Sequence, residues 1–289
     1  MQIELKNDTM TAVFDTRGAE LKSLIKDGRE YMWSGDPAYW NRTSPVLFPI
    51  VGALKDGVYR YKGYEYPMGQ HGFARDREFE IAGQTESSAS FRLDSDAESK
   101  KLYPFEFELT IIYALNKNEL SITWIVKNLD DKTMYFSIGA HPAFMVKTDA
   151  DGTMNGNYIQ MDTHGSLTAT DFADGLVQHS THTIDLDDDG CFALTAHTFD
   201  NGVHIFEHDQ AQRVSILDAD KKPYVTVEFN TPLFGIWSPE KKNAPFLCIE
   251  PWYGRADAAD FDGDLQERRY VQSLEEGISF RSGYKILFD

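Results

Sequence analysis

The feature that most constrains this chain is an alternation of apolar and polar side chains with a period of two residues. Successive side chains of a β-strand point to opposite faces, so the pattern places the apolar side chains on one face. Two such runs separated by a short polar segment predict an antiparallel hairpin. The clearest runs are Phe107, Leu109, Ile111 and Tyr113, followed after residues 116–119 by Leu120, Ile122, Trp124 and Val126.

Further strands follow from the same pattern. Residues 59–61 and 64–66 are expected to pair across Lys62-Gly63, and residues 225–229 alternate in the same way. No long amphipathic helix is predicted, and short helical pieces are expected only within 36–40 and 265–271. Turn-forming dipeptides separate the strands along the chain: Asp27-Gly28, Asp56-Gly57, Asp151-Gly152, Asn155-Gly156, Asp189-Gly190 and Asn201-Gly202.

These observations predict an all-β protein built as a large antiparallel β-sandwich. The chain has 289 residues, a length at which all-β sandwiches and barrels commonly form one unit. It contains no low-complexity linker, fixed-period repeat or sharp change in composition. We therefore expect one domain spanning residues 1–289.

The formal net charge of −18 excludes two classes of partner. A surface of this sign repels nucleic-acid backbones and anionic lipids, which bind proteins through clustered Lys and Arg that this sequence lacks. We therefore expect neither nucleic acid nor a membrane as partner. A small anionic substrate stays open, because a few arginines near a site outweigh a distant acidic surface at physiological screening lengths.

The cysteines and the start of the chain indicate the compartment. Cys191 and Cys248 are too few for a disulfide framework and match no paired spacing of a zinc or redox motif. The first residues lack a basic segment followed by an apolar run, and no apolar run approaches about 18 residues. We expect a cytoplasmic protein with both cysteines reduced.

No metal site is expected from the acidic or histidine-containing segments. The Asp185–Asp189 cluster lacks the ordered glycine and distal glutamate of an EF-hand loop and is interpreted as a solvated turn. His179 and His182 are three residues apart, so on a strand they face opposite sides, and no third ligand is evident.

Three segments place a titratable residue among glycine, proline and aromatic residues, where the backbone is restricted and sugar rings can stack. Each alone also fits a structural role: a hydrogen-bonded histidine, a carboxylate at a strand end, or, for Trp252 and Phe144, a core or cleft wall. Glu250 follows the apolar run 244–249, so burial in a cleft would raise its proton affinity. The segments are Gln70–Arg75 with His71, Gly139–Phe144 with His141, and Cys248–Gly254 with Glu250.

In this order and at these separations, the three segments resemble the aldose 1-epimerase family. The resemblance spans most of the chain and is strongest to the bacterial LacX-like branch. His71 is followed by Gly72-Phe73-Ala74-Arg75, whereas two glycines follow the first histidine of the galactose mutarotases, and this segment resembles hexose-phosphate epimerases as well. Two further segments carry the resemblance: Arg42 followed by Pro45–Gly52, and Phe234–Trp237 leading into Glu250-Pro251-Trp252.

The resemblance implies a galactose mutarotase-like supersandwich that needs no cofactor. It also implies that Glu250 is the general base on the C1 hydroxyl and that protonated His141 is the acid on the ring oxygen. His71 would hold the ring oxygen or a neighbouring hydroxyl, and which histidine is the acid stays open. Arg42 would bind sugar oxygens as a multi-donor fork.

Three further residues are candidate substrate contacts. Asp200 occupies a place similar to a substrate-binding aspartate of the galactose mutarotases, although its surroundings differ. Arg75 and Arg77 would reach the phosphate of a sugar 6-phosphate, with solvated surface charges as the alternative. The predicted substrate is an aldose, and glucose, galactose and their 6-phosphates stay open.

Two other functions compete with the epimerase hypothesis. A non-catalytic sugar-binding or sensing protein would keep the same cleft and use these side chains only as hydrogen-bond partners. A glycoside hydrolase or lyase would need a second carboxylate, for which Asp257 or Asp260 are the candidates. A homodimer through an exposed edge strand or aromatic patch is compatible with the sequence, which does not decide the oligomeric state.

Overall fold

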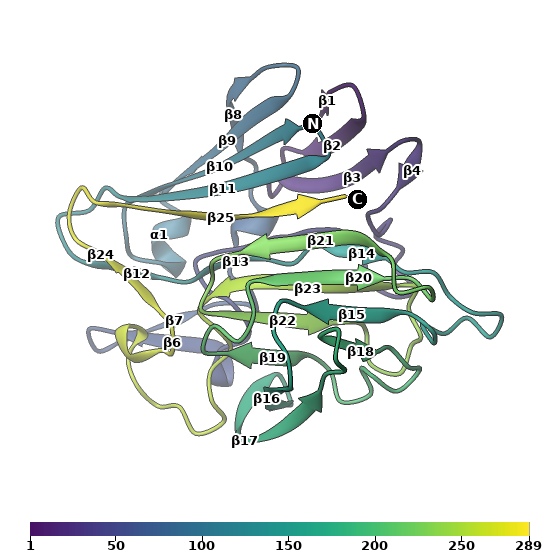
Figure 1. Cartoon of the computed structure of the whole chain (residues 1–289). Helices are drawn as coiled ribbons and strands as arrows, with labels where there is room; N and C mark the ends of the chain where they lie inside the picture. Colours follow the sequence, from purple (N-terminus) through teal and green to yellow (C-terminus); the bar gives the residue numbers. More distant parts are fainter. Residues whose placement is uncertain (289) are drawn as a thin grey trace.

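The structure is a computed structural model that describes residues 1–288, and it consists mainly of antiparallel strands (Figure 1). The all-β prediction is confirmed. The largest sheet has nine strands in the order β18 (Cys191–Ala193), β15 (Tyr158–Met161), β20 (Arg213–Leu217), β21 (Pro223–Phe229), β25 (Ser279–Leu287), β11 (Glu119–Asn128), β10 (Phe107–Asn116), β9 (Ser88–Asp94) and β8 (Glu80–Gln84).

A second sheet carries the segments predicted to be functional. It is eight-stranded, and β14 (Ala143–Met145) joins it through β23. Its other strands run in the order β17 (Leu176–Asp185), β16 (Ser166–Ala173), β19 (His204–Glu207), β22 (Leu233–Trp237), β23 (Phe246–Tyr253), β13 (Ile138–Ala140) and β5 (Val46–Leu47).

Smaller elements complete the fold. An N-terminal sheet contains β1 (Gln2–Lys6), β2 (Met10–Asp15), β3 (Glu20–Lys26) and β4 (Arg29–Glu30), while β6 (Val58–Tyr61) pairs with β7 (Tyr64–Pro67) and β12 (Met134–Phe136) with β24 (Gln272–Leu274). The helical pieces are short: α1 (Ser99–Leu102) and the 3₁₀ turns Lys55–Gly57, Ala74–Asp76 and Leu265–Glu267.

The hairpins predicted from alternation are confirmed. β10 and β11 pair from Phe107 opposite Asn128 to Asn116 opposite Glu119, and the apolar residues of the alternation are buried along both strands. The tyrosine hairpin of β6 and β7 also has the predicted register, with Tyr59 opposite Tyr66. Of the helical expectations, 265–271 holds a 3₁₀ turn, whereas 36–40 forms only a turn closed by the Trp40 amide on the Asp36 carbonyl at 3.0 Å.

The nine-stranded sheet packs against the N-terminal sheet and the eight-stranded sheet. At one end Phe14 of β2 lies 4.3 Å from Tyr113 of β10, and at the other Phe229 of β21 lies 5.1 Å from Phe234 of β22, measured between ring centroids. In Figure 1, β20 and β21 accordingly lie over β22 and β23, while β8–β11 extend towards the N-terminal sheet. This packing buries one face of β22 and β23. Side chains on the opposite face of these two strands line a cavity.

Three expectations about the rest of the chain can be compared with the structure. Cys191 and Cys248 are both buried and unpaired. The acidic segment 185–189 forms a turn in which Asp187 and Asp189 both pair with Lys221. Within residues 1–288, no helix has the length and apolar character needed to cross a membrane.

Candidate active site

A cavity of about 320 Å³ opens beside β22 and β23 and collects the three predicted segments. His71, His141, Glu250 and Trp252 all line it, although they are distant in sequence. The volume lies in the range of small-molecule sites. The remaining lining residues are Trp40, Gly52, Gln70, Arg75, Phe172, Gly175, Val203, Ile205, Trp237, Glu240 and Ala256.

A break in strand pairing brings His141 next to Glu250. β13 pairs Gly139 with Trp252 of β23, and β14 resumes pairing at Ala143 with Cys248. Pro142 has no amide hydrogen to donate to a ladder, so the chain leaves the sheet between these two points. The bulged residues therefore lie opposite Glu250, and Nε2 of His141 is 3.2 Å from Oε2 of Glu250.

Both members of this pair are deeply buried, at 7% exposure for His141 and 1% for Glu250. Burial raises the pKa of Glu250 well above its ordinary value, because the charged carboxylate loses its hydration. The same cause lowers the pKa of His141 to about 3. The favoured state of the pair therefore has a protonated carboxyl and a neutral imidazole, which together hold one acidic proton.

Aromatic rings fix the imidazole of His141. Trp40 stacks on it with centroids 4.7 Å apart and planes 26° apart, and Trp237 meets it edge-on at 5.3 Å. Trp40 is itself held by a 2.9 Å hydrogen bond from the Trp33 indole to its carbonyl. The sequence analysis missed Trp40 as a site residue, since its position two residues before Arg42 was the only signal.

His71 is held by its backbone and by one ring nitrogen. His71 has a φ of 66° and Gly72 a φ of 70°, so both residues have left-handed backbone conformations. A side chain at position 72 would also collide with the Phe48 carbonyl, so this position requires glycine. The Gly52 amide donates to Nδ1 of His71 at 3.1 Å, so the ring proton of neutral His71 is on Nε2. Burial lowers the pKa of His71 well below its ordinary value, which keeps the ring neutral.

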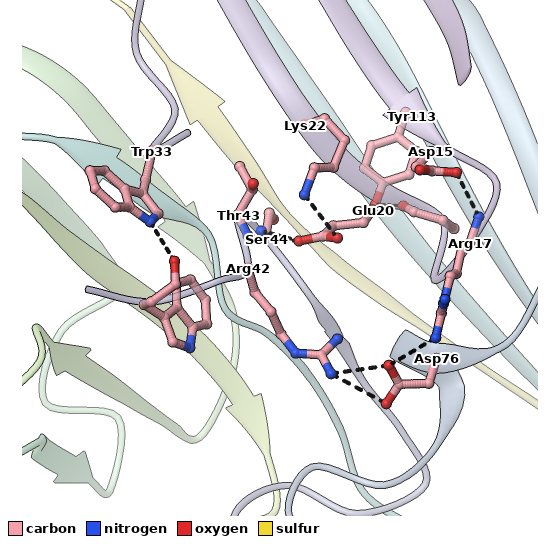
Figure 2. Close-up of polar contacts among 12 residues, drawn as sticks. Asp15, Arg17, Glu20, Lys22, Trp33, Arg42, Thr43, Ser44, Asp76 and Tyr113 are labelled. Carbon is pink, nitrogen blue, oxygen red and sulfur yellow. Dashed lines mark hydrogen bonds and ion pairs between the residues drawn. The ribbon is translucent and has the colours of Figure 1, made fainter. Parts of the chain in front are cut away.

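Arginines gather beside the His71 end of the cavity. Arg75 lines it and donates to the Gln70 carbonyl at 2.7 Å. Arg42 lies outside the set of lining residues and holds Asp76 at 3.0 Å, where Arg17 at 3.8 Å and Arg75 at 3.8 Å share the same carboxylate. Figure 2 shows Arg17 and Arg42 converging on Asp76. Three guanidinium groups thus share one carboxylate.

The backbone that carries Arg42 is anchored by a carboxylate. Oε1 of Glu20 accepts hydrogen bonds from the amides of Thr43 at 2.7 Å and Ser44 at 2.9 Å, and Lys22 pairs with Oε2 at 3.2 Å (Figure 2). Glu20 is half-buried, and its hydrogen bonds fix the backbone of residues 43–44 next to Arg42.

Trp252 forms a wall of the cavity. A Cβ atom added at Gly235 would lie 2.6 Å from its ring, and one at Gly139 would lie 2.7 Å from it. Both positions therefore leave room for the indole only as glycine. Phe144 is fully buried and belongs to the core, so it offers no stacking face.

Other residues singled out in the sequence lie elsewhere. Asp200 pairs with His197 at 2.8 Å and lines an adjoining cavity of about 590 Å³. Arg77 pairs with Asp96 and does not line the first cavity. The two cavities share Phe172, Gly175, Val203 and Glu240.

The two carboxylates that a hydrolase would need as partners of Glu250, Asp257 and Asp260, lie outside its cavity. Asp257 is buried in a 2.6 Å ion pair with Arg268, and Asp260 pairs with exposed His179 at 2.9 Å. Neither lines the cavity that contains Glu250. Glu240 does line it, and nothing in its sequence setting identified it.

Comparisons with known proteins identify the family of the chain. Residues 1–267 match the family model described as Aldose 1-epimerase. The chain is 32% identical to Protein LacX, plasmid, of Lactococcus lactis subsp. lactis, over 99% of both chains. A galactose mutarotase related enzyme from Lactobacillus acidophilus superposes with a TM-score of 0.94 at 34% identity, covering 100% of this chain and 97% of that one. A galactose mutarotase-like protein from Lactobacillus casei gives 0.92 at 31% identity over 100% of both.

Proposed function

The chain belongs to the aldose 1-epimerase family and is an isomerase of the mutarotase type, and we propose that it interconverts the α and β anomers of a hexose through Glu250 and His141. The observation that carries the proposal is their 3.2 Å contact in the wall of a cavity of sugar size. Ring opening needs one group that takes a proton and one that gives a proton, and this pair supplies both.

The proposed reaction starts from the charge-separated form of the pair. The Glu250 carboxylate removes the proton of the C1 hydroxyl while imidazolium His141 protonates the ring oxygen. The bond between C1 and the ring oxygen breaks, and the open aldehyde rotates about C1–C2. Closure onto the other face returns both protons, so the pair ends the cycle as it began.

The shifted pKa values support this exchange. Because burial disfavours both charged side chains, the Glu250 carboxylate is a stronger base and the His141 imidazolium a stronger acid than either group is in water. His71 is proposed to donate its Nε2 hydrogen to the ring oxygen or to an adjacent hydroxyl, in an orientation fixed by the Gly52 amide.

The test is exchange between anomers of freshly dissolved α-glucose and α-galactose, followed by polarimetry or NMR. Glu250→Gln keeps the side-chain volume nearly unchanged, His141→Asn puts a smaller neutral amide in place of the imidazole, and both remove proton transfer. Each is expected to lower kcat by about 10² or more. Sugar binding without acceleration by the unmodified protein would refute the proposal and favour a sugar sensor.

A second substrate, a hexose 6-phosphate, is favoured by the arginine cluster. Arg17, Arg42 and Arg75 share the single carboxylate of Asp76, which leaves positive charge in excess next to the cavity. Guanidinium groups bind phosphate through paired, charge-assisted hydrogen bonds. The same exchange experiment with glucose 6-phosphate and galactose 6-phosphate distinguishes the two substrate classes.

A further inference from the structure

A cysteine completes a three-donor cluster beneath the candidate acid/base pair. Cys248 precedes Glu250 by two residues on β23, so both side chains lie on the same face of the strand. The Sγ atom of Cys248, a ring nitrogen of His141 and a carboxylate oxygen of Glu250 all lie within 4.8 Å of one another. Thiolate, imidazole and carboxylate are the ligand types that zinc uses in proteins.

The cluster is buried, and part of its hydrogen-bonding capacity is not used. Cys248 is fully buried, Nδ1 of His141 is buried without a hydrogen-bond partner among the described residues, and buried Oε2 of Glu250 has the 3.2 Å contact with Nε2 of His141. Buried polar atoms in folded proteins normally have partners, so unused donors and acceptors at one point indicate room for a ligand interaction.

We propose that Cys248, His141 and Glu250 bind a zinc-class divalent cation, and that this cation inhibits the enzyme. The 3.2 Å between the histidine nitrogen and the glutamate oxygen is close to the separation of about 3.3 Å that two tetrahedral bonds of about 2.0 Å produce. The Sγ atom of Cys248 lies within 4.8 Å of both other donor atoms and must move closer to take the third coordination position, at about 2.3 Å from the metal.

The fourth position faces the cavity, because Glu250 and His141 line it and Cys248 does not. Binding requires two protons to leave to solvent, one from the Cys248 thiol and one from the Glu250 carboxyl, while the imidazole stays neutral. The cation then occupies the lone pairs that the proposed reaction uses. Magnesium and calcium prefer oxygen ligands, so this donor set selects against them.

Cobalt(II) provides a probe that reports sulfur ligation directly. Titration of the whole protein should give a thiolate-to-cobalt charge-transfer band that saturates at one equivalent and is displaced by Zn²⁺. Cys248→Ala should abolish the band. Cys191→Ala is the matched control, because Cys191 is the other buried free cysteine and lies on β18 of the nine-stranded sheet. The cobalt band of the Cys191→Ala variant should be unchanged.

The inhibition of anomer exchange by the bound cation rests on the proposed function, whereas cation binding itself does not. Stoichiometric Zn²⁺ should abolish anomer exchange in the unmodified protein and in Cys191→Ala, and a chelator should restore it. Cys248→Ala should require about tenfold or more Zn²⁺ to inhibit half of its own metal-free activity.

The outcomes separate the two proposals. Absence of the cobalt band, or a band that survives in Cys248→Ala, overturns the cation site whether or not the protein is active. A Cys248-dependent band in a protein that exchanges no anomers supports the site and refutes the proposed function. Equal Zn²⁺ inhibition of all three proteins overturns inhibition through this site.

Discussion

The buried carboxyl of Glu250 links stability to pH. Because its pKa is raised above the ordinary 4.5 in the folded state, folding favours the protonated form, and stability is lost as pH rises from about 4.5 towards the raised value. A tenfold difference in proton affinity between the folded and unfolded states corresponds to about 1.4 kcal/mol. Glu250→Gln cannot titrate, so its melting temperature should exceed that of the unmodified protein by an amount that grows between pH 5 and pH 8.

The comparison needs an exposed carboxyl as control. Glu4→Gln on the exposed face of β1 should give a difference that does not depend on pH. His141 has the opposite effect, because its pKa is lowered to about 3 in the folded protein. The folded protein therefore loses stability as the pH falls below 6.5, where the imidazole gains a proton only in the unfolded chain. A Glu250→Gln difference that stays constant from pH 5 to pH 8 would contradict a raised pKa for Glu250.

The indole of Trp40, which stacks on His141, should raise the pKa of that imidazole. An aromatic face stabilises an imidazolium, so Trp40→Leu should lower the pKa of His141 further and reduce kcat about 2- to 10-fold. The limb of the pH–rate profile where activity falls with falling pH should move to lower pH, because it reports protonation of the neutral imidazole in the resting pair. Trp40→Phe should retain the unmodified profile. Equal losses in both variants with unchanged profiles would assign Trp40 a structural role only.

At the residue scale, the sequence identified the residues whose surroundings are local. His71, His141 and Glu250 stand next to glycine, proline or aromatic residues in their own segments, and the structure brings them to one cavity. Asp200 and Arg77 do not line that cavity: Asp200 pairs with His197 and lines the adjoining cavity, and Arg77 pairs with Asp96. Trp40 and Glu240 reach it through tertiary packing that no local pattern encodes.

At the element scale, the interrupted strand formed by β13 and β14 positions the acid/base pair, and Gly235 on β22 supports it from the other side. A Cβ atom at Gly235 would lie 2.6 Å from the Trp252 ring. Gly235→Ala should therefore displace the indole, destabilise the protein by about 1–3 kcal/mol and lower kcat. Urea denaturation and anomer exchange measure the two effects.

Gly69→Ala is the matched control for Gly235→Ala. It lies beside the His71 segment, but no atom approaches within 4 Å of an added Cβ and its φ is not in the left-handed region. Its stability and kcat should stay close to those of the unmodified protein. An unaffected Gly235→Ala variant would mean that the Trp252 ring moves freely and does not fix the cavity wall.

Elements were predictable where pairing is local. The β10–β11 hairpin follows from alternation on both sides of a short turn, and its register was confirmed. The pairing of β13 with β5 and β23 joins segments far apart in sequence and includes strands of two or three residues. Alternation has no meaning over so few residues, so only the fold of the whole chain reveals this arrangement.

At the scale of the whole molecule, charge distribution separates the two substrate classes. The net charge of −18 opposes an anionic substrate at long range, but this field is screened within about 8 Å at physiological ionic strength. The arginines around Asp76 act inside that distance from the cavity wall, since Arg75 itself lines it. The local cluster should therefore decide whether a phosphate binds.

Arg75→Met tests this decision because methionine keeps most of the apolar stem and removes the charge. If the substrate is a hexose 6-phosphate, kcat/KM for that sugar should fall about 10- to 100-fold while the value for the unphosphorylated hexose changes little. Arg92→Met, in an exposed ion pair with Glu80, is the control and should leave both values unchanged. An equal fall for both sugars would assign Arg75 to hydroxyl binding, and the phosphate hypothesis would then be wrong.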